Sequence, residues 1–226
     1  MFNKEPLRII DSIYDFIGDY TDDYIENYDE ISNDISEGGP LLESCIISNL
    51  CEVITKYFEC EKIIDIGCGF GNVLYNSYAK KKVGIDISFN QLRRVDGSII
   101  KVRCNAEDIP IENEYFDFVI CTDIFEHVLS IKNLVNEIDR LLVMNGSLLF
   151  ATPWKQDISV YDTKEYQKKF KKRKYVHLRS IDDNVIEKNF GDRFKIINTT
   201  LITAAMKYMV FKPYPVKFIH FIKREM

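Results

Sequence analysis

The stretch Ile63–Asn72, which reads IIDIGCGFGN, constrains the fold of this chain more than any other segment. It is an apolar run that ends in three glycines at alternate positions, Gly67, Gly69 and Gly71. Glycines cost conformational entropy on folding, so three of them this close together indicate a turn that a ligand approaches closely. A buried strand, then a glycine turn, then a helix forms ligand sites at the carboxyl end of parallel sheets.

The segments around this stretch alternate between strands and helices. Hydrophobic periodicity and β-branched content predict strands at 63–66, 82–87, 99–104, 115–122 and 146–152. Helical spacing predicts a longer helix before the first strand, at 41–58, and short helices at 72–80, 90–95 and 131–142. Strands that alternate with helices through short connections imply parallel βαβ units with helices on both faces of one sheet.

The last third of the chain breaks this alternation. A helix is predicted at 181–190 with Ser180 as its cap, followed by apolar strands at 194–203 and 216–223. The pattern shows no full helix between these two strands, which favours an antiparallel pairing at the end of the sheet. The predicted fold class is therefore α/β, a doubly wound, Rossmann-like, mostly parallel seven-stranded sheet with an antiparallel final strand.

Two carboxylates define the ligand that the glycine turn would accept. Asp86 ends the second predicted strand, 21 residues after Asp65, where an acidic residue hydrogen-bonds ribose hydroxyls in nucleotide sites. The glycine order is G-x-G-x-G, whereas a dinucleotide site has G-x-G-x-x-G. Asp65 lies two residues before the first glycine, where a carboxylate suits an ammonium group rather than a pyrophosphate. S-adenosylmethionine, with an adenosine, an α-ammonium and no phosphate, fits this pattern.

The motifs, taken in order, resemble those of the class I S-adenosylmethionine-dependent methyltransferases. DIGCGFGN resembles their first motif and VGIDIS, residues 83–88, their second. Residues 104–128, CNAEDIPIENEYFDFVICTDIFEHV, resemble the third and fourth motifs of the small-molecule (type 11-like) branch, which includes quinone and sugar methyltransferases. The resemblance covers about residues 60–153 and implies transfer of a methyl group to an O or N of a small molecule.

The resemblance also implies a cofactor site. Its residues are Asp65, Gly67, Cys68, Gly69, Gly71, Asp86, Ile87, Asn105, Ala106, Glu107, Thr122 and Asp123. Asn105 departs from the family pattern, which has Asp at this position, but its amide carbonyl can still accept from an adenine amino group. The implied organisation is one methyltransferase domain over 1–226, with a helical lid or cap at 1–40, a cofactor-binding core at 60–153, and a substrate-side insert with the final strands at 154–226.

The candidate catalytic residues are two histidines. Methyl transfer needs a positioned nucleophile, and a general base only when the acceptor is a hydroxyl or a protonated amine. His127 follows Glu126 just after the fourth predicted strand, where substrate meets cofactor in the family. His177 lies before the helix at 181–190 and resembles a substrate-facing histidine of the same branch. Each has a structural alternative, and His220, inside an apolar strand, is interpreted as structural.

Composition predicts neither a metal site nor a targeting or membrane-spanning segment. None of the six cysteines forms a C-x-x-C pair, and a second acceptor-side carboxylate beside Asp123 is not evident, so no metal site is predicted. The net charge is −5, the start lacks the apolar segment of a signal peptide, and no window reaches the length of a membrane span. We therefore expect a cytoplasmic protein with free thiols.

Several alternatives stay open at this level. The basic segment 164–174 could guide a peptide or RNA acceptor, although the sequence Cys121-Thr122-Asp123-Ile124 after the fourth strand argues against enzymes that act on a flipped adenine. Nucleic acid is thus a less favoured partner than a small molecule. A domain that binds cofactor without turnover is a third possibility, and the glycine spacing disfavours a dehydrogenase. The apolar segment 204–215 leaves peripheral membrane contact open, and no pattern indicates an oligomeric state.

Overall fold

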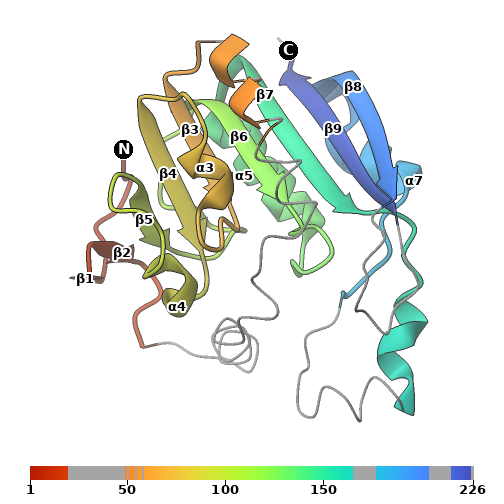
Figure 1. Cartoon of the computed structure of the whole chain (residues 1–226), viewed down its shortest axis with the longest axis horizontal. Helices are drawn as coiled ribbons and strands as arrows, with labels where there is room; N and C mark the ends of the chain where they lie inside the picture. The colour runs from red at the N-terminus through yellow and green to blue at the C-terminus, as the bar shows by residue number, and fades with distance from the viewer. Residues whose placement is uncertain are drawn as a thin grey trace.

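The computed structural model describes residues 1–19, 49, 51–53, 55–57, 59–164, 177–203 and 215–224. Nine strands form one sheet in the order β1-β2-β5-β4-β3-β6-β7-β9-β8 (Figure 1). The five central strands are β3 (Lys62–Ile66), β4 (Lys81–Asp86), β5 (Ile100–Arg103), β6 (Phe116–Thr122) and β7 (Leu142–Pro153). All five run parallel, so their carboxyl ends meet along the same edge of the sheet. This confirms the mostly parallel α/β sheet predicted from the alternating pattern.

The last two strands close one side of the sheet. β9 (Pro215–Lys223) pairs antiparallel with β7 and with β8 (Phe194–Thr203). The prediction of an antiparallel final strand is therefore confirmed, and β9 lies between β7 and β8, which takes the edge. Returning antiparallel lets β9 cover the hydrogen-bonding edge of β7 without a second crossover helix.

The N-terminus differs from the prediction. β1 (Arg8–Ile10) and β2 (Ile13–Asp15) form a hairpin whose second strand pairs parallel with β5. Within the described part of the chain the sheet therefore has nine strands rather than seven, and the expected helical lid at 1–40 is wrong for residues 8–15. The strands are three residues long, too short to show a periodicity in the sequence. Residues 20–40 of the predicted lid lie outside the described part of the chain.

Buried ionic contacts attach this hairpin to the sheet. The Asp15 carboxylate is fully buried and accepts from Arg8 Nε at 2.7 Å and from the backbone N–H groups of Ile17 and Gly18 at 2.9 and 3.0 Å. Arg103, at the end of β5, lies 3.4 Å from the same carboxylate and donates to the Gly18 carbonyl at 2.9 Å. Local charge pairing thus secures strands that are too short to bury much apolar surface.

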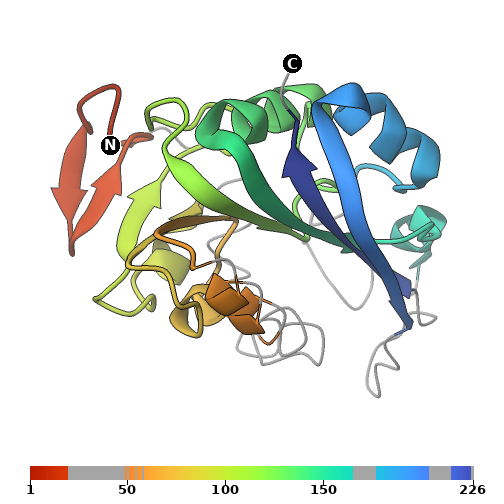
Figure 2. The ribbon, with the colours of Figure 1, turned by 90° about the horizontal axis from the view of Figure 1, so that it is seen from above.

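Alternate residues of the central strands face two separate hydrophobic clusters. Ile63, Phe118 and Ile120 belong to one cluster, while Ile64 and Val119 belong to the other. On the first face lie the described helical residues between 49 and 57, α3 (Asn72–Tyr75) and α4 (Phe89–Leu92). The second face is covered by α5 (Ile131–Leu141) and α7 (Asp183–Phe190), and Figure 2 shows the two sets on opposite sides of the sheet. The predicted doubly wound arrangement is confirmed.

Three helices have other boundaries than those predicted. The helix expected at 72–80 is only the four residues of α3, and the one expected at 90–95 is α4, which ends at Leu92. α7 begins at Asp183, because the Asp182 carboxylate rather than Ser180 caps it, accepting from Val185 N at 3.0 Å. Ile181 instead forms a parallel bridge with Trp154. Two short 3₁₀ helices, η1 (Ile158–Asp162) and η2 (Gly191–Arg193), complete the described elements. Among these elements, no helix combines the length and apolar character needed to cross a membrane.

We expect the Asp15→Asn variant to lose about 3 kcal/mol of unfolding free energy at neutral pH, because it leaves Arg8 and Arg103 facing a neutral amide. Burial alone would raise the pKa of Asp15, but the Gly18 N–H, the Arg8 guanidinium and the Ile17 N–H lower it below the ordinary value of 3.8. The carboxylate therefore stabilises the fold above that value and ceases to do so as the pH falls through the lowered pKa. Urea denaturation of both proteins between pH 7 and pH 3 measures the difference, which should shrink in acid.

Asp19→Asn is the matched control, because Asp19 pairs with the same Arg8 but its side chain is 93% exposed. It should unfold close to wild type. Equal effects of the two substitutions would contradict the attachment of the hairpin through Asp15.

Candidate active site

The glycine turn lies at the carboxyl end of β3 and has the backbone geometry that its composition predicts. Gly67, Gly69 and Gly71 have φ angles of 76°, 52° and 75°, all in the left-handed region. A Cβ on Gly67 would lie 2.0 Å from Ile124 Cδ1, so the loop after β6 packs directly on the turn. Gly71 then serves as the N-cap of α3. The turn brings the backbone N–H groups of a helix start to the sheet edge, where they can face a ligand.

Asp86 ties this turn to the end of β4. Its carboxylate accepts from Gly69 N at 3.0 Å and from Ser88 N at 2.8 Å. The Ser88 hydroxyl in turn caps α4 by accepting from Gln91 N at 3.2 Å. The acidic residue predicted to bind ribose therefore lies against the glycine turn, and it orients the loops after two adjacent strands.

Asp65 is a buried carboxyl just before the turn. Its side chain is 2% exposed, and among the described residues its Oδ1 has no hydrogen-bond partner. Burial, together with the charge of Asp86, raises the pKa of Asp65 to about 8. A buried carboxyl that lacks a partner is costly unless a cation or donor pairs with it. Asp65 therefore suits the ammonium group that the sequence analysis assigned to it.

The other predicted cofactor residues occupy the same sheet edge with different side-chain directions. Cys68 is buried and packs its sulfur against Gly84, where an added Cβ would lie 2.8 Å from Sγ. Ile87 directly follows β4, and its carbonyl accepts from Arg103 Nε at 3.1 Å. Thr122 ends β6, and Asp123 follows it with a φ of 54° while its N–H donates to Ala151 O at 3.0 Å.

The segment after β5 is held by its own polar side chains. Asn105 is exposed and its Oδ1 accepts from Glu107 N at 2.9 Å, beside the half-buried Ala106. Both carboxylate oxygens of Glu107 accept backbone N–H bonds, from Leu129 at 2.8 Å and Ser130 at 3.1 Å. Glu107 therefore connects this loop to the start of α5, which is a positioning role that the sequence did not indicate.

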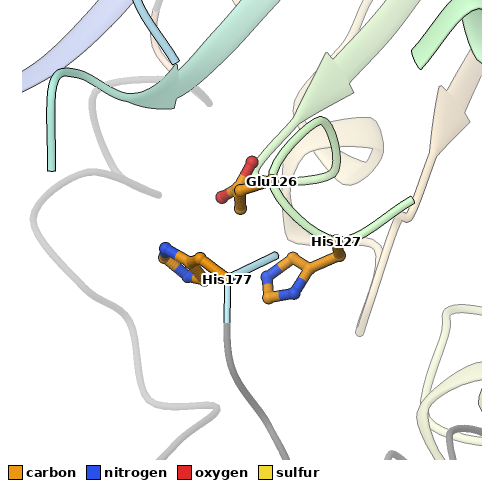
Figure 3. A group of neighbouring side chains, drawn as sticks. All are labelled: Glu126, His127 and His177. Carbon is orange, nitrogen blue, oxygen red and sulfur yellow. The ribbon is translucent and has the colours of Figure 1, made fainter. Parts of the chain in front are cut away.

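His127 and His177, 50 residues apart in the chain, meet in the structure. Their rings pack edge to face with centroids 4.7 Å apart. Glu126 joins them, and Figure 3 shows the three side chains converging from the loop after β6 and from the segment before α7. The nearest ligand-type atoms of the three residues all lie within 4.8 Å of one another. The structure thus brings both predicted catalytic histidines together and adds Glu126, which the sequence analysis did not include.

Burial controls the protonation of this cluster. Burial lowers the pKa of His127 to about 3, helped by His177 and Arg179, and lowers the pKa of His177 to about 4. Burial, followed by the charge of Asp123, raises the pKa of the Glu126 carboxyl well above its ordinary value. Glu126 Oε2 accepts from Thr152 Oγ1 at 3.2 Å. Both imidazoles are therefore uncharged near neutral pH, and burial favours the protonated form of the Glu126 carboxyl.

Residues from three segments support the cluster. His177 Nδ1 donates to Gln156 Oε1, and Gln156 Nε2 donates to Tyr161 Oη at 3.4 Å. Arg179 donates to the carbonyls of Phe125, Val128 and Leu129, so it holds the loop that carries Glu126 and His127. Sequence reasoning missed Gln156, Tyr161 and Arg179, because no local spacing links them to the loop. By contrast, His220 is remote, buried in β9 with Nε2 3.2 Å from Ser147 Oγ, as its structural interpretation implied.

Part of this chain is similar in sequence to known methyltransferases. Residues 64–150 match the family model described as "Methyltransferase domain". An uncharacterized protein of Methanocaldococcus jannaschii is 35% identical over 100 residues, which are 43% of this chain and 44% of that protein. Sarcosine/dimethylglycine N-methyltransferase of Aphanothece halophytica is 25% identical over 125 residues, covering 49% of this chain and 44% of the relative. The matched stretch thus spans less than half the length of both relatives.

Solved structures share the fold. A SAM-dependent methyltransferase of Methanosarcina mazei superposes with a TM-score of 0.53 at 18% identity, covering 73% of this chain and 92% of the other. At this identity the likeness concerns the fold alone. Together with the family match it confirms the Rossmann-like architecture and the resemblance inferred from the motifs, and the cofactor named for this structure is the one expected from the glycine turn.

We expect Gly67→Ala to destabilise the protein by about 2 kcal/mol or more, because alanine pays a left-handed backbone penalty and its Cβ collides with Ile124. Gly97→Ala is the control, since a Cβ at Gly97 meets no atom within 4 Å. Thermal unfolding of the two variants measures the difference. If Gly67→Ala melts at the wild-type temperature, the turn does not have the close packing described above.

Proposed function

We propose that this chain, whose residues 64–150 match the methyltransferase domain model, is an S-adenosylmethionine-dependent methyltransferase that moves a methyl group to an O or N of a small molecule. The observation that carries this proposal is the glycine turn with two carboxylates beside it. Asp86 contacts the turn directly, and Asp65 presents a buried oxygen without a described partner. A pyrophosphate offers no donor to a buried carboxyl such as Asp65, whereas a ribose and an ammonium group would each find an acceptor in this pair of acids.

The cofactor, when bound, supplies a methyl group that its sulfonium already activates. The residues of this chain have binding and orienting roles. At Gly67, Gly69 and Gly71 an added Cβ would collide with neighbouring side chains of the protein, so glycine lets the turn keep its closely packed, left-handed backbone at the sheet edge. Asp86 is proposed to accept from ribose hydroxyls, and Asp65 from the α-ammonium. The half-buried Ile87 and Ala106 are proposed to contact the adenine, beside Asn105.

The acceptor is proposed to bind near Glu126, His127 and His177. Glu126 and His127 lie in the loop after β6, which also carries Asp123, and His177 lies in the segment before α7. The neutral imidazoles are suited to hydrogen-bond an acceptor hydroxyl or amine. The relative that acts on sarcosine and dimethylglycine, both small amines, favours a small-molecule acceptor. The basic segment 164–174, which could guide a macromolecular acceptor, lies outside the described residues apart from Lys164.

Calorimetric titration with S-adenosylhomocysteine tests the cofactor proposal. Wild type should bind with micromolar affinity and should not bind NAD. Asp86→Asn should weaken binding by about 10- to 100-fold, since a charge-assisted hydrogen bond contributes roughly 1.5–3 kcal/mol. Asp96→Asn is the control, because Asp96 is an exposed carboxylate that accepts from Ser98 N. Absence of binding to wild type would refute the cofactor assignment.

A second titration tests Asp65. Its pKa of about 8 means that it is mostly protonated at pH 7, and an ammonium group beside it would favour the carboxylate. Binding of S-adenosylhomocysteine at pH 7 should therefore release close to one proton, measured from the enthalpy in buffers of different ionisation heat. Methylthioadenosine, which lacks the ammonium group, and the Asp65→Asn variant should show no release. Equal proton release with both ligands would contradict this role.

A further inference from the structure

We propose that Glu126, His127 and His177 form a binding site for a divalent transition-metal ion, with Zn²⁺ as the expected ion. The cysteine spacing and the residues around Asp123 predict no metal site, so the histidines bring in ligands that the sequence pattern did not indicate. The three residues combine two imidazoles with one carboxylate, a set that leaves coordination positions open for water or substrate. The proposal does not rest on methyl transfer, since metal binding can be measured without cofactor or acceptor.

Proximity is the first argument. One ligand atom from each residue lies within 4.8 Å of the others, and the three side chains converge on one region in Figure 3. Bonds of about 2.0–2.1 Å to Zn²⁺ in a tetrahedron place ligand atoms roughly 3.4 Å apart. Small side-chain rotations would therefore close the triangle around an ion, with no movement of the sheet.

The second argument is a buried acceptor that the described protein leaves unsatisfied. Glu126 is 1% exposed, and among the described residues its Oε1 has no hydrogen-bond partner, while Oε2 accepts only from Thr152. A buried carboxyl oxygen without a partner costs free energy, and native proteins generally resolve such a group with a ligand, a water or an ion. A cation between Glu126 and the two imidazoles would satisfy it.

A hydrogen bond to a neighbouring side chain orients His177 in the way that metal-ligating histidines are usually oriented. Gln156 Oε1 can only accept, so His177 Nδ1 carries the proton and its lone pair lies on Nε2. Metal-ligating histidines usually donate their second ring N–H to such an oxygen, which fixes the tautomer and the ring orientation. Gln156 is itself 8% exposed and held by Tyr161. The backbone N–H of Leu178, next to His177, donates to the Glu126 carbonyl at 2.8 Å. This hydrogen bond joins the segment before α7 to the loop after β6.

The proposal changes the role of the histidines. An imidazole nitrogen that binds a metal ion cannot also accept a proton from the acceptor. A histidine whose ring nitrogen binds the metal ion therefore cannot use that same nitrogen as a general base. Metal binding by the isolated protein distinguishes them before any acceptor is known.

The test uses the full chain, treated with chelator and dialysed, and titrated with Zn²⁺ by calorimetry and with Co²⁺ by absorption. We expect one ion per chain with a Zn²⁺ dissociation constant of about 1 μM or tighter. Co²⁺ should give d–d bands without thiolate charge transfer, which separates this site from the free cysteines such as Cys121. Glu126→Gln and His177→Ala should each weaken Zn²⁺ binding by roughly 100-fold.

His220→Asn is the matched control, because His220 is buried in β9 and bonded to Ser147 away from the cluster. It should bind Zn²⁺ like wild type. Glu126→Gln keeps the shape of the side chain and His177 is only partly buried, so circular dichroism should show both variants folded. The proposal is overturned if wild type takes up no stoichiometric ion, if Co²⁺ shows thiolate ligation, or if His177→Ala and Glu126→Gln bind Zn²⁺ as wild type does. Loss of metal binding would leave the cofactor titrations unaffected, so the two proposals fail separately.

Discussion

The two hydrogen bonds that the Asp86 carboxylate accepts, from Gly69 and Ser88, are the contacts on which the candidate site depends. They join the loop after β3 to the loop after β4, at the edge where the parallel strands end. Parallel pairing alone brings these loops near each other, but it does not orient their backbone. The carboxylate does so from a buried position, and its two acceptors satisfy N–H groups that the glycine turn and the start of α4 would otherwise leave open.

Several ionisable side chains are buried where the parallel strands end, and their burial costs stability. Asp65, Glu126 and His127 are each at least nine-tenths buried, and burial shifts their pKa values toward the neutral forms. Groups shifted in this way are concentrated at functional sites, because their protonation can respond to a ligand. Asp65 lies beside the glycine turn, whereas Glu126 and His127 lie beyond β6. The two ends of the site thus differ in chemistry, with an isolated carboxyl at one and a mixed carboxyl and imidazole cluster at the other.

Interlocking backbone contacts hold that cluster in place. Arg179 donates to three carbonyls of the loop after β6, while Glu107 accepts from two N–H groups at the start of α5. Phe125, at the centre of the same loop, packs edge to face on Phe150 and stacks on Phe190 of α7. The loop is therefore held by polar contacts on its exposed side and by aromatic packing toward the core. This rigidity is what a site needs in order to hold reacting groups at a fixed separation.

The sequence by itself determined the parallel core, the glycine turn, the two acids and the family resemblance, because each depends on residues close together in the chain. Strand alternation, left-handed glycines and carboxylates at strand ends are local signals. The tertiary structure alone decided the rest. It replaced part of the expected helical lid by a hairpin secured through Asp15 and Arg103, and it moved the cap of α7 to Asp182. It also brought His177 and Gln156 to Glu126 and His127, since contacts between distant segments depend on how the chain packs and leave no mark in local spacing.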